Sequence, residues 1–406
     1  MIEGDIIKRI FILFIIFCVG CSNETKKEII MKDFVNKDIK EVKEFCDNNN
    51  VKLDIKYENN YYISKDIVIS QNIEKNKKVS ESDTLTIVVS NGEIDKDKLK
   101  EDNINELGKV PIMMYHSIIN MKDSETKNIG GNVDKDGYNR TTESFIRDLE
   151  FYYNEGYRMV RLNDYINGNV DVEYGKSPII LTFDDGNDNN IKVNGIDDNG
   201  NIIIDENSAV GILESFKKKY PDFNITATFF VNEGLFKQNK YNEQILKWLV
   251  DNNYDIGNHT KGHIDISKKN SNEVSTSVGY IYNTLDKIIP DRYVKIVALP
   301  FGSPYKKEHA NFNSVLNSEY NNIKYETISS LRVGWEPEVS VFNKDFDKTF
   351  LKRVRAYDNG GVDFDIEMVF KNLKKDKFIS DGMKDIVTIK ESDKDLLKTD
   401  LKINMY

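Results

Sequence analysis

Several kinds of residue are scarce in this sequence, and each scarcity narrows the class of protein. Basic residues number 57 against 67 acidic ones, which gives a net charge of −10. Nucleic acid as a partner demands a basic face, so this composition argues against it. Of the three cysteines, Cys18 and Cys21 lie near the N-terminus and Cys46 alone remains for the body of the chain, which excludes a disulfide-built scaffold. Only four histidines are present, so each one is a candidate ligand or acid–base group.

The N-terminal segment combines a basic pair with a short apolar run. Lys8-Arg9 precede ten consecutive apolar residues, Ile10 to Val19, and Gly20-Cys21 follow. A membrane-spanning helix needs about 20 apolar residues, whereas this pattern is typical of a secretory signal. The ending "CVGC" resembles a bacterial lipobox, which implies lipidation of Cys21. We therefore expect a signal peptide over 1–21 and a lipid anchor at the extracellular face of the bacterial cell membrane. Simple secretion and an uncleaved anchor are the alternatives.

A small domain is expected between two charged stretches, 22–29 and 93–109, whose composition is typical of linkers. "IKEVKEFCDNN" places its apolar residues on one face of a helix, and "VKLDIKYE", "DIVISQNI" and "DTLTIVVSNG" have the pattern of strands. This predicts an α+β domain over 30–92. The sequence pattern, from "DFVNKDIKEVKEF" through "VISQ" to "DTLTIVVSNG", resembles that of a PASTA domain. The resemblance implies association with cell-wall peptidoglycan, either as a binding module or as a spacer above the membrane.

Beyond residue 109, short apolar runs alternate with amphipathic stretches. The runs are "VPIMMYH", "YRMVRL", "SPIILTF", "ITATFFV", "YDIGNH", "VKIVALP" and "KYETIS". Buried strands that alternate with helices indicate an α/β architecture with a parallel sheet, and seven such strands predict a distorted (β/α)7 barrel over 110–365. Residues 366–406 are then a C-terminal extension. The polar insert 187–207 is expected to form a hairpin that turns at Asn199-Gly200, with a calcium loop as the alternative.

Reactive residues follow several of these runs, and in a parallel α/β fold such residues gather beyond the carboxyl ends of the strands. Asp184 and Asp185 follow "IILTF", and adjacent carboxylates repel each other unless they are paired or coordinate a cation; an acidic turn is the alternative. His259 and His263, after "YDIGN", have the i, i+4 spacing that suits a divalent metal, with solvent-facing loop histidines as the alternative. Two histidines and one carboxylate make a three-ligand zinc site with a position open for water, as a hydrolytic metal requires.

Together these motifs resemble the polysaccharide deacetylase family, which is carbohydrate esterase family four and has NodB homology. "TFDDG" matches the first family motif, "HTKGH" matches the second, H-[ST]-x-x-H, and "ALPFGSPY" is similar to the third. The first two occur in order, with Asp184 and His259 75 residues apart, and this conjunction is specific. The likeness spans about residues 110–340. It implies a metal-dependent hydrolase that acts on carbon–nitrogen bonds other than peptide bonds.

The resemblance also implies a role for each matching residue. Asp184 would be the general base, and the backbone N–H of Phe301 would help to stabilise an oxyanion. The divalent metal, expected to be zinc with cobalt, nickel or manganese as alternatives, would be held by Asp185, His259 and His263. The implied substrate-binding residues are Pro300, Tyr305 and Trp335. For Trp335, plain core packing is the alternative.

Two departures from the family pattern point to one branch of it. Ala298 stands where the third motif often has an arginine that orients the base. The candidate substitutes are Arg332, Arg353 and Arg355. The pattern "LKRVRA" nevertheless predicts that the last two lie on the polar face of a strand. The family's C-terminal leucine-x-histidine is also missing, and His309 is expected to face solvent. "MYH", which ends on His116, supplies that pattern at the first strand, and a barrel places its first strand beside its last. The sequence therefore resembles the circularly permuted branch, in which His116 would be the general acid; a structural strand-end histidine is the alternative.

The expected function is the removal of N-acetyl groups from amino sugars of a cell-wall glycan. The PASTA-like segment favours peptidoglycan N-acetylglucosamine as the substrate. Within the same fold, the alternatives are an exopolysaccharide N-deacetylase and a xylan-type O-deacetylase. The alternative from another class is a non-catalytic wall-binding lipoprotein, which the missing motif arginine favours.

Overall fold

The computed structural model describes residues 28–170, 172–362 and 364–406, so the expected signal peptide and Cys21 lie outside the described residues. The chain divides into two compact units, Met1–Glu93 and Ile94–Tyr406. Within the described ranges, no helix combines the length and the apolar character that crossing a membrane requires.

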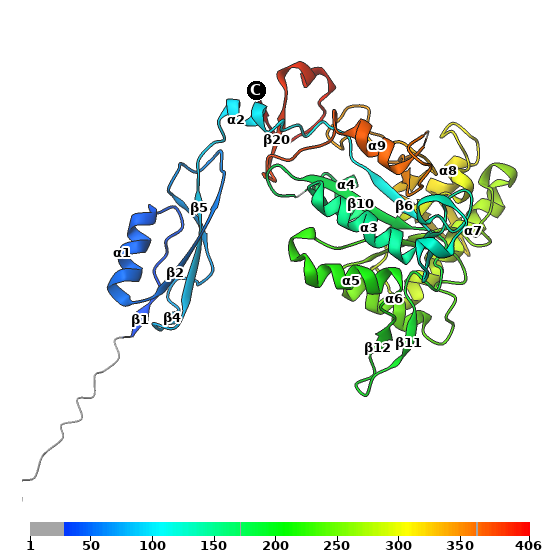
Figure 1. Ribbon diagram of the computed structural model, residues 1–406, viewed down its shortest axis with the longest axis horizontal. Helices are drawn as coiled ribbons and strands as arrows, with labels where there is room; N and C mark the ends of the chain where they lie inside the picture. The colour runs from blue at the N-terminus through cyan, green and yellow to red at the C-terminus, as the bar shows by residue number, and fades with distance from the viewer. Residues whose placement is uncertain (1–27, 171, 363) are drawn as a thin grey trace, which may run out of the picture. The chain divides into compact units, whose positions relative to one another are not determined.

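The first unit packs one helix against a three-stranded sheet (Figure 1). Helix α1 (Ile39–Asn49) is capped by Asp38, whose side chain accepts a hydrogen bond from the N–H of Lys40, and it buries the apolar face that the sequence predicts. The strands are β1 (Ile29–Ile30), β2 (Lys52–Glu58), β3 (Val68–Gln71), β4 (Lys78–Val79) and β5 (Thr84–Ser90). β5 pairs parallel with β2 and antiparallel with β3, while β1 and β4 form a separate antiparallel pair. The predicted α+β architecture is confirmed.

The second unit is built on an eight-stranded parallel sheet. Its order is β18-β15-β14-β13-β10-β6-β19, with β9 paired to the first residues of β10. The strands are β6 (Ile112–Tyr115), β9 (Tyr157–Met159), β10 (Ser177–Phe183), β13 (Thr228–Val231), β14 (Asp255–Asn258), β15 (Ile296–Ala298), β18 (Ser329–Leu331) and β19 (Val354–Arg355). All neighbouring strands in this sheet run parallel.

The segment 349–355 joins the two edges of this curled sheet, and we call it the closing segment. At its start, the N–H of Leu351 donates to the carbonyl of Ser330 in β18. Just past its end, the N–H of Ala356 donates to the carbonyl of Met114 in β6. One stretch of chain therefore bonds to β18 at one end of the strand order and, through β19, to β6 at the other end, and the predicted (β/α) barrel is confirmed.

Alternate side chains of the strands fill two separate cores. Ile112 and Ile180 belong to the core inside the barrel, whereas the intervening Met113 and Leu181 pack outward against the helices, because successive residues of a strand face opposite sides. Figure 1 shows α3, α5 and α6 along the outside of the sheet. The helices of the barrel are α3 (Thr142–Asn154), α4 (Leu162–Ile166), α5 (Ala209–Lys219), α6 (Asn242–Asp251), α7 (Ser271–Ile288) and α8 (Phe312–Leu316).

Both ends of the second unit are folded, which corrects the linker predicted at 93–109. Helix α2 (Lys96–Glu101) buries Leu99, and the N–H of Asn105 donates to the carbonyl of Ile379. The C-terminal extension packs as well: α9 (Ile366–Leu373) places Phe370 against aromatic rings of α3. Two further strands, β20 (Ile386–Ile389) and β21 (Lys402–Met405), pair parallel.

Shorter segments complete the unit. The insert forms the predicted hairpin of β11 (Val193–Ile196) and β12 (Ile202–Ile204), which projects from the barrel (Figure 1). Its Asp197 side chain accepts hydrogen bonds from the N–H groups of Asn199 and Asn201, within the turn itself. The other short pairs are β7 (Ile118–Ile119) with β8 (Arg140–Thr141), and β16 (Asn317–Tyr320) with β17 (Ile323–Glu326).

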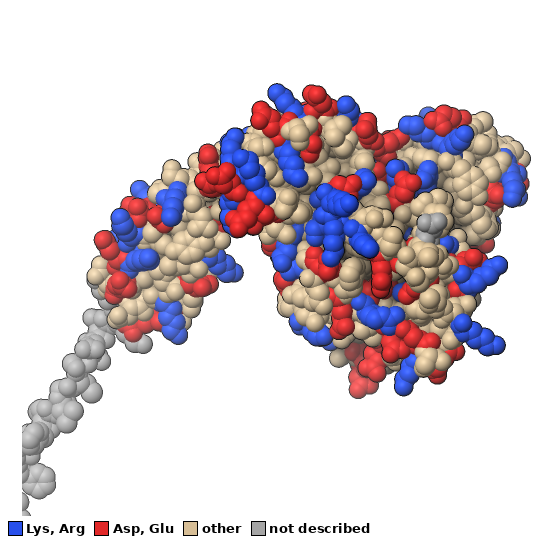
Figure 2. Space-filling view, turned by 45° about the horizontal axis from the view of Figure 1, so that its top comes forward, with Lys and Arg blue, Asp and Glu red and all other residues tan. Residues whose placement is uncertain are grey.

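On the face seen in Figure 2, basic and acidic side chains are largely intermixed.

Candidate functional site

The carboxyl ends of β6 and β10 bring His116 and Asp184 to one edge of the barrel. Tyr115 and Phe183 are in register across this parallel pair, so the next residues, His116 and Asp184, follow at neighbouring positions. The N–H of Asp184 donates to the carbonyl of Tyr115 at 2.9 Å. The two side chains therefore start from neighbouring backbone positions at the same strand ends. Burial lowers the pKa of His116, and the charge of Asp184 opposes that effect.

Asp185, His259 and His263 form a candidate metal centre. One ligand atom from each lies within 4.8 Å of the others. Oδ1 of Asp185 is 3.2 Å from Nε2 of His259 and 3.5 Å from Nε2 of His263. Asp185 and His263 have positive φ angles, 75° and 46°, so the chain turns sharply beside each ligand. All three predicted ligands are therefore brought together.

The hydrogen bonding of His259 fits a divalent cation at this centre. Its Nδ1 lies 2.9 Å from the carbonyl oxygen of Ala298. A carbonyl only accepts, so Nδ1 carries the proton and Nε2 presents its lone pair. That Nε2 is buried and has no hydrogen-bond partner in the described part of the chain. A lone pair that faces a carboxylate oxygen at close range is stable when a cation is shared between them, and a His₂–carboxylate set with an open position is typical of catalytic zinc.

Negative charge dominates the electrostatics of the centre. Burial lowers the pKa of His259, but the carboxylates of Asp184 and Asp185 outweigh burial and raise it. For His263, burial and the neighbouring His259 lower the pKa. The two carboxylates, Asp184 buried and Asp185 partly exposed, therefore favour a positive charge at the ligand cluster, which a divalent cation would supply.

Asp184 is held by an arginine whose position the sequence analysis predicted wrongly. Nη1 and Nη2 of Arg353 donate parallel hydrogen bonds to the two carboxylate oxygens, at 2.8 and 2.7 Å. The side chains are only 0% and 1% exposed. Burial alone would raise the pKa of Asp184, but the charge and hydrogen bonds of Arg353 contribute to lowering it. Arg353 thus does not lie on a solvent-facing strand side. It stands in the closing segment and orients the carboxylate, which is the role left vacant at Ala298.

His116 is half-buried beside the Asp184–Arg353 pair. Burial lowers the pKa of its imidazole, although the charges of Asp184 and Asp185 oppose this effect. Its carbonyl oxygen accepts a hydrogen bond of 2.6 Å from Nδ2 of Asn190, which fixes the backbone at the strand end. The ring of Tyr138 lies edge-on to the imidazole with centroids 4.9 Å apart. These contacts hold the imidazole at the strand end, beside the carboxylate of Asp184.

The third motif forms a tight turn over the ligand cluster. Phe301 follows β15 with φ of 58°, in the 3-10 turn Pro300–Gly302. Its ring lies edge-on to His263, with centroids 4.6 Å apart. Its N–H makes no hydrogen bond among the residues that the structure describes. Pro300 is buried and restricts the turn. The turn therefore presents a free backbone donor next to a ligand.

The other predicted substrate-binding residues are exposed aromatics. Trp335 is 50% exposed, pairs with Val354 of the closing segment and contacts the ring of Phe364 at 4.7 Å. It therefore lies at the rim of the barrel and not in its core. Tyr305 is 69% exposed, and no hydrogen bond, ion pair or ring contact joins it to those predicted site residues that the structure describes. His309, expected to face solvent, is half-buried, and its Nδ1 accepts from the N–H of Asn311.

The fold and the site together define a class: an α/β barrel with a histidine–carboxylate ligand set, an oriented carboxylate and a further histidine at its strand ends. Residues 171–320 match the polysaccharide deacetylase family, and residues 29–91 match the PASTA domain. The chain therefore contains a domain with similarity to the polysaccharide deacetylase family, preceded by a PASTA domain.

Solved structures with similarity to the chain include two deacetylases. The Streptococcus pyogenes deacetylase PplD in complex with acetate is 19% identical, covers 66% of this chain and 98% of its own, and has a TM-score of 0.46. A de-N-acetylase from Aggregatibacter actinomycetemcomitans is 13% identical, with coverages of 65% and 99% and a TM-score of 0.42. The extracellular region of the Ser/Thr kinase PrkC from Staphylococcus aureus is 33% identical over 16% of this chain and 24% of its own, with a TM-score of 0.16. Comparison with curated protein sequences found no match.

Proposed function

We propose that the protein is a metal-dependent N-deacetylase that removes acetyl groups from amino sugars of cell-wall peptidoglycan. One observation carries the proposal: a carboxylate oriented by a buried arginine, Asp184, stands beside a ligand set whose atoms lie within 4.8 Å of one another. The family match over 171–320 supports deacetylation as the reaction class. The PASTA domain over 29–91 supports a wall glycan as the substrate.

In this proposal each site residue has one role. A divalent cation, zinc in the first instance, would be held by Asp185, His259 and His263 and would polarise the acetamide carbonyl and acidify a water molecule. Asp184 stays ionised because its pKa is lowered, and Arg353 fixes its orientation, so that it can accept the proton of the attacking water. The free N–H of Phe301 donates to the oxygen of the tetrahedral intermediate. His116 then donates a proton to the departing amine.

The same proposal includes a location. Cys21, outside the described residues, would carry a lipid that anchors the protein at the extracellular face of the cell membrane, where peptidoglycan is within reach. Trp335 and Tyr305 would contact the glycan, since their aromatic rings are exposed and can pack on the apolar faces of sugars. Pro300, which is buried, would shape the turn beside them.

The test measures acetate release by the full chain, loaded with zinc or cobalt, from peptidoglycan, poly-N-acetylglucosamine and acetylated xylan. We expect release from peptidoglycan, and a loss of about 10²–10⁴-fold in kcat in Asp184→Asn and in His116→Ala, because each removes a proton-transfer group. Metal stoichiometry should stay at that of the unaltered protein in both variants. His309→Ala is the matched control, and its activity should be unchanged.

The alternatives give different results in the same assay. Preference for poly-N-acetylglucosamine would indicate an exopolysaccharide N-deacetylase, and preference for xylan an O-deacetylase. Binding to wall sacculi without acetate release from any substrate would indicate a non-catalytic wall-binding lipoprotein. Loss of bound metal in His116→Ala would exclude His116 as the acid.

A further inference from the structure

A second arginine stands next to the one that holds Asp184. Arg353 and Arg355 are two residues apart in extended chain, so their side chains leave the sheet on the same side. Arg353 is fully engaged with Asp184. Arg355 lies on β19, in register with Met114 of β6, and is therefore two residues closer to the carboxyl ends of the strands. We call this end of the barrel, where His116 follows β6, the mouth.

The guanidinium of Arg355 lies between two aromatic rings. It is 4.9 Å from the ring centre of Tyr138 and 4.6 Å from that of Tyr357. Tyr138 in turn contacts the ring of His116. Stacking of this kind orders a long side chain before any ligand arrives and leaves the edge of the guanidinium plane free.

The hydrogen-bond donors of Arg355 are unused. Within the described part of the chain, its side chain makes no hydrogen bond and no ion pair. It is nonetheless half-buried and permanently charged. The buried arginines of this unit behave differently: Arg140 is paired with Asp148 and Arg353 with Asp184. Arg355 is therefore an ordered cation at the mouth whose partner is not part of the protein around it.

We propose that Arg355 binds a carboxylate of the substrate, close to the acetamide that is hydrolysed. This rests on the proposed function. A guanidinium matches a carboxylate with two parallel hydrogen bonds, and one cation suits a group with a single negative charge. The preferred substrate is then an acidic glycan, one whose acetylated amino sugar bears a carboxylate on itself or on its neighbour.

Two sources of that carboxylate exist in a peptidoglycan chain. A muramic-type sugar carries a lactyl carboxylate, which is free on strands without peptides and becomes an amide where a peptide is attached. The peptide itself carries carboxylates further from the sugar. Three probes separate these sources: N-acetylglucosamine oligomers, glycan strands with free lactyl groups, and the same strands with peptides.

The experiment measures both binding, by calorimetry, and acetate release for each probe. With the free lactyl carboxylate as ligand, we expect the strands without peptides to be preferred over neutral oligomers by at least about tenfold in Kd and in kcat/KM, as one charge-assisted hydrogen-bonded pair supplies. Arg355→Gln should abolish that preference and leave the neutral oligomer unaffected. Arg355→Lys should retain part of it, because the charge remains. Arg292→Gln, an exposed arginine paired with Asp251, is the matched control and should behave as wild type.

The binding measurement separates this inference from the proposed function. If no probe releases acetate, the proposed function is wrong, yet a carboxylate preference in binding that disappears in Arg355→Gln still supports the inference. A preference for strands with peptides would also support it and would assign the carboxylate to the peptide. Equal binding of neutral and acidic probes by wild type would overturn it. An equal loss for all probes in Arg355→Gln would overturn it too, because Arg355 would then only position Tyr138 and Tyr357.

Discussion

At the scale of single residues, the ion pair of Arg353 and Asp184 contributes both to the stability of the fold and to the orientation of the proposed general base. Two buried charges are stable together because each neutralises the other, and the bidentate geometry fixes the carboxylate that would accept the proton. The nearby carboxylate of Asp185 is not held in this way and remains available as a ligand. Two adjacent aspartates therefore have different partners, and the difference comes from the closing segment.

Replacing Arg353 tests this coupling. We expect Arg353→Met to lower the free energy of unfolding by about 3–5 kcal/mol, since it leaves a buried carboxylate without its partner. Burial then acts on Asp184 with less opposition and raises its pKa, so the acid limb of the rate profile should move to higher pH. Chemical denaturation and acetate release against pH measure the two effects.

The double variant provides the control. Arg353→Met combined with Asp184→Asn removes both charges, and it should be less destabilised than the sum of the single variants. Strict additivity would contradict a direct interaction between the two side chains.

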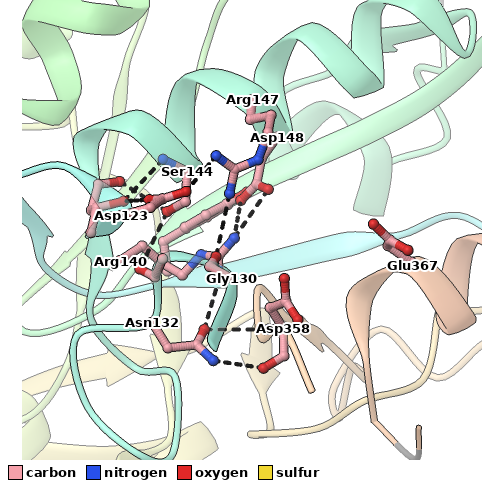
Figure 3. A network of polar contacts seen from close by, with 12 residues as sticks. Asp123, Gly130, Asn132, Arg140, Ser144, Arg147, Asp148, Asp358 and Glu367 are labelled. Carbon is pink, nitrogen blue, oxygen red and sulfur yellow. Dashed lines mark hydrogen bonds and ion pairs between the residues drawn. The ribbon is translucent and has the colours of Figure 1, made fainter. Parts of the chain in front are cut away.

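At the scale of elements, two loops at the mouth are held together by one asparagine. Nδ2 of Asn132 donates to the carbonyl of Asp358 at 2.6 Å, and the N–H of Asp358 donates back to Oδ1 of Asn132. Figure 3 shows Arg140 above the contact between Asn132 and Asp358, with hydrogen bonds to the carbonyl of Gly130, to Asn132 and to Asp148 of α3. The hydrogen bonds between Asn132 and Asp358 therefore hold together the two loops that carry Tyr138 and Tyr357.

A glycine between these loops allows their close approach. Gly137 has φ of 66°, and a Cβ added there would lie 2.1 Å from Cδ2 of Tyr357. Gly137→Ala must therefore move Tyr357 and, with it, the stack on Arg355 and the contact of Tyr138 with His116. We expect kcat/KM for the glycan to fall by about ten- to hundredfold, because misplacement of a positioning group by about 1 Å has that effect. Acetate-release kinetics measure it.

The hairpin outside the barrel offers a matched control. Gly200 also has a positive φ, 86°, but nothing lies within 4 Å of an added Cβ. Gly200→Ala should lose about 1 kcal/mol of stability through backbone strain alone and keep its kcat/KM. If both variants reduced kcat/KM equally, the mouth contacts would not explain the effect of Gly137→Ala.

Elements with strong local patterns were predictable from the sequence. The face of α1, the hairpin at Asn199-Gly200 and the alternation of strands and helices follow local rules and are confirmed. The side of the closing segment that carries Arg353 was not predictable, because a polar alternation looks the same whether it faces solvent or a charged partner inside a barrel. Helix α2 was missed because its charged sequence buries the single residue Leu99, a tertiary contact that local composition cannot show.

At the scale of the second unit, its two chain ends are joined through buried carboxylates. Glu106, before β6, accepts hydrogen bonds from the N–H groups of Thr388 and Asp381 and from the hydroxyl of Ser380. Glu106 and Asp381 are both buried. Neither lies in the family-matched stretch 171–320, so the fold of the unit extends to contacts beyond the matched residues at both ends.

This pair predicts a dependence of stability on pH. Burial raises the pKa of Asp381 to about 6, and burial together with the charge of Asp381 raises that of Glu106. Unfolded carboxyl groups titrate near pH 4, so between about pH 4 and 6 the folded protein holds protons that the unfolded chain has released. The stability from this difference is complete below about pH 4 and is lost as the pH rises through about 6. Relative to wild type, Asp381→Asn should therefore gain about 3 kcal/mol in unfolding free energy between pH 4 and pH 7.

Urea denaturation at pH 4, 5, 6 and 7 measures that difference, and the change with pH matters more than its absolute size. Asp376→Asn removes one negative charge from the same region, where Asp376 is half-exposed and paired with Lys109, and its difference from wild type should stay constant. Glu106→Gln should follow Asp381→Asn in direction, since its carboxyl shares the raised pKa. If the difference in unfolding free energy between Asp381→Asn and wild type also stayed constant with pH, the prediction would be wrong. The hydrogen bonds that join the two chain ends would then not depend on the protonation of Asp381.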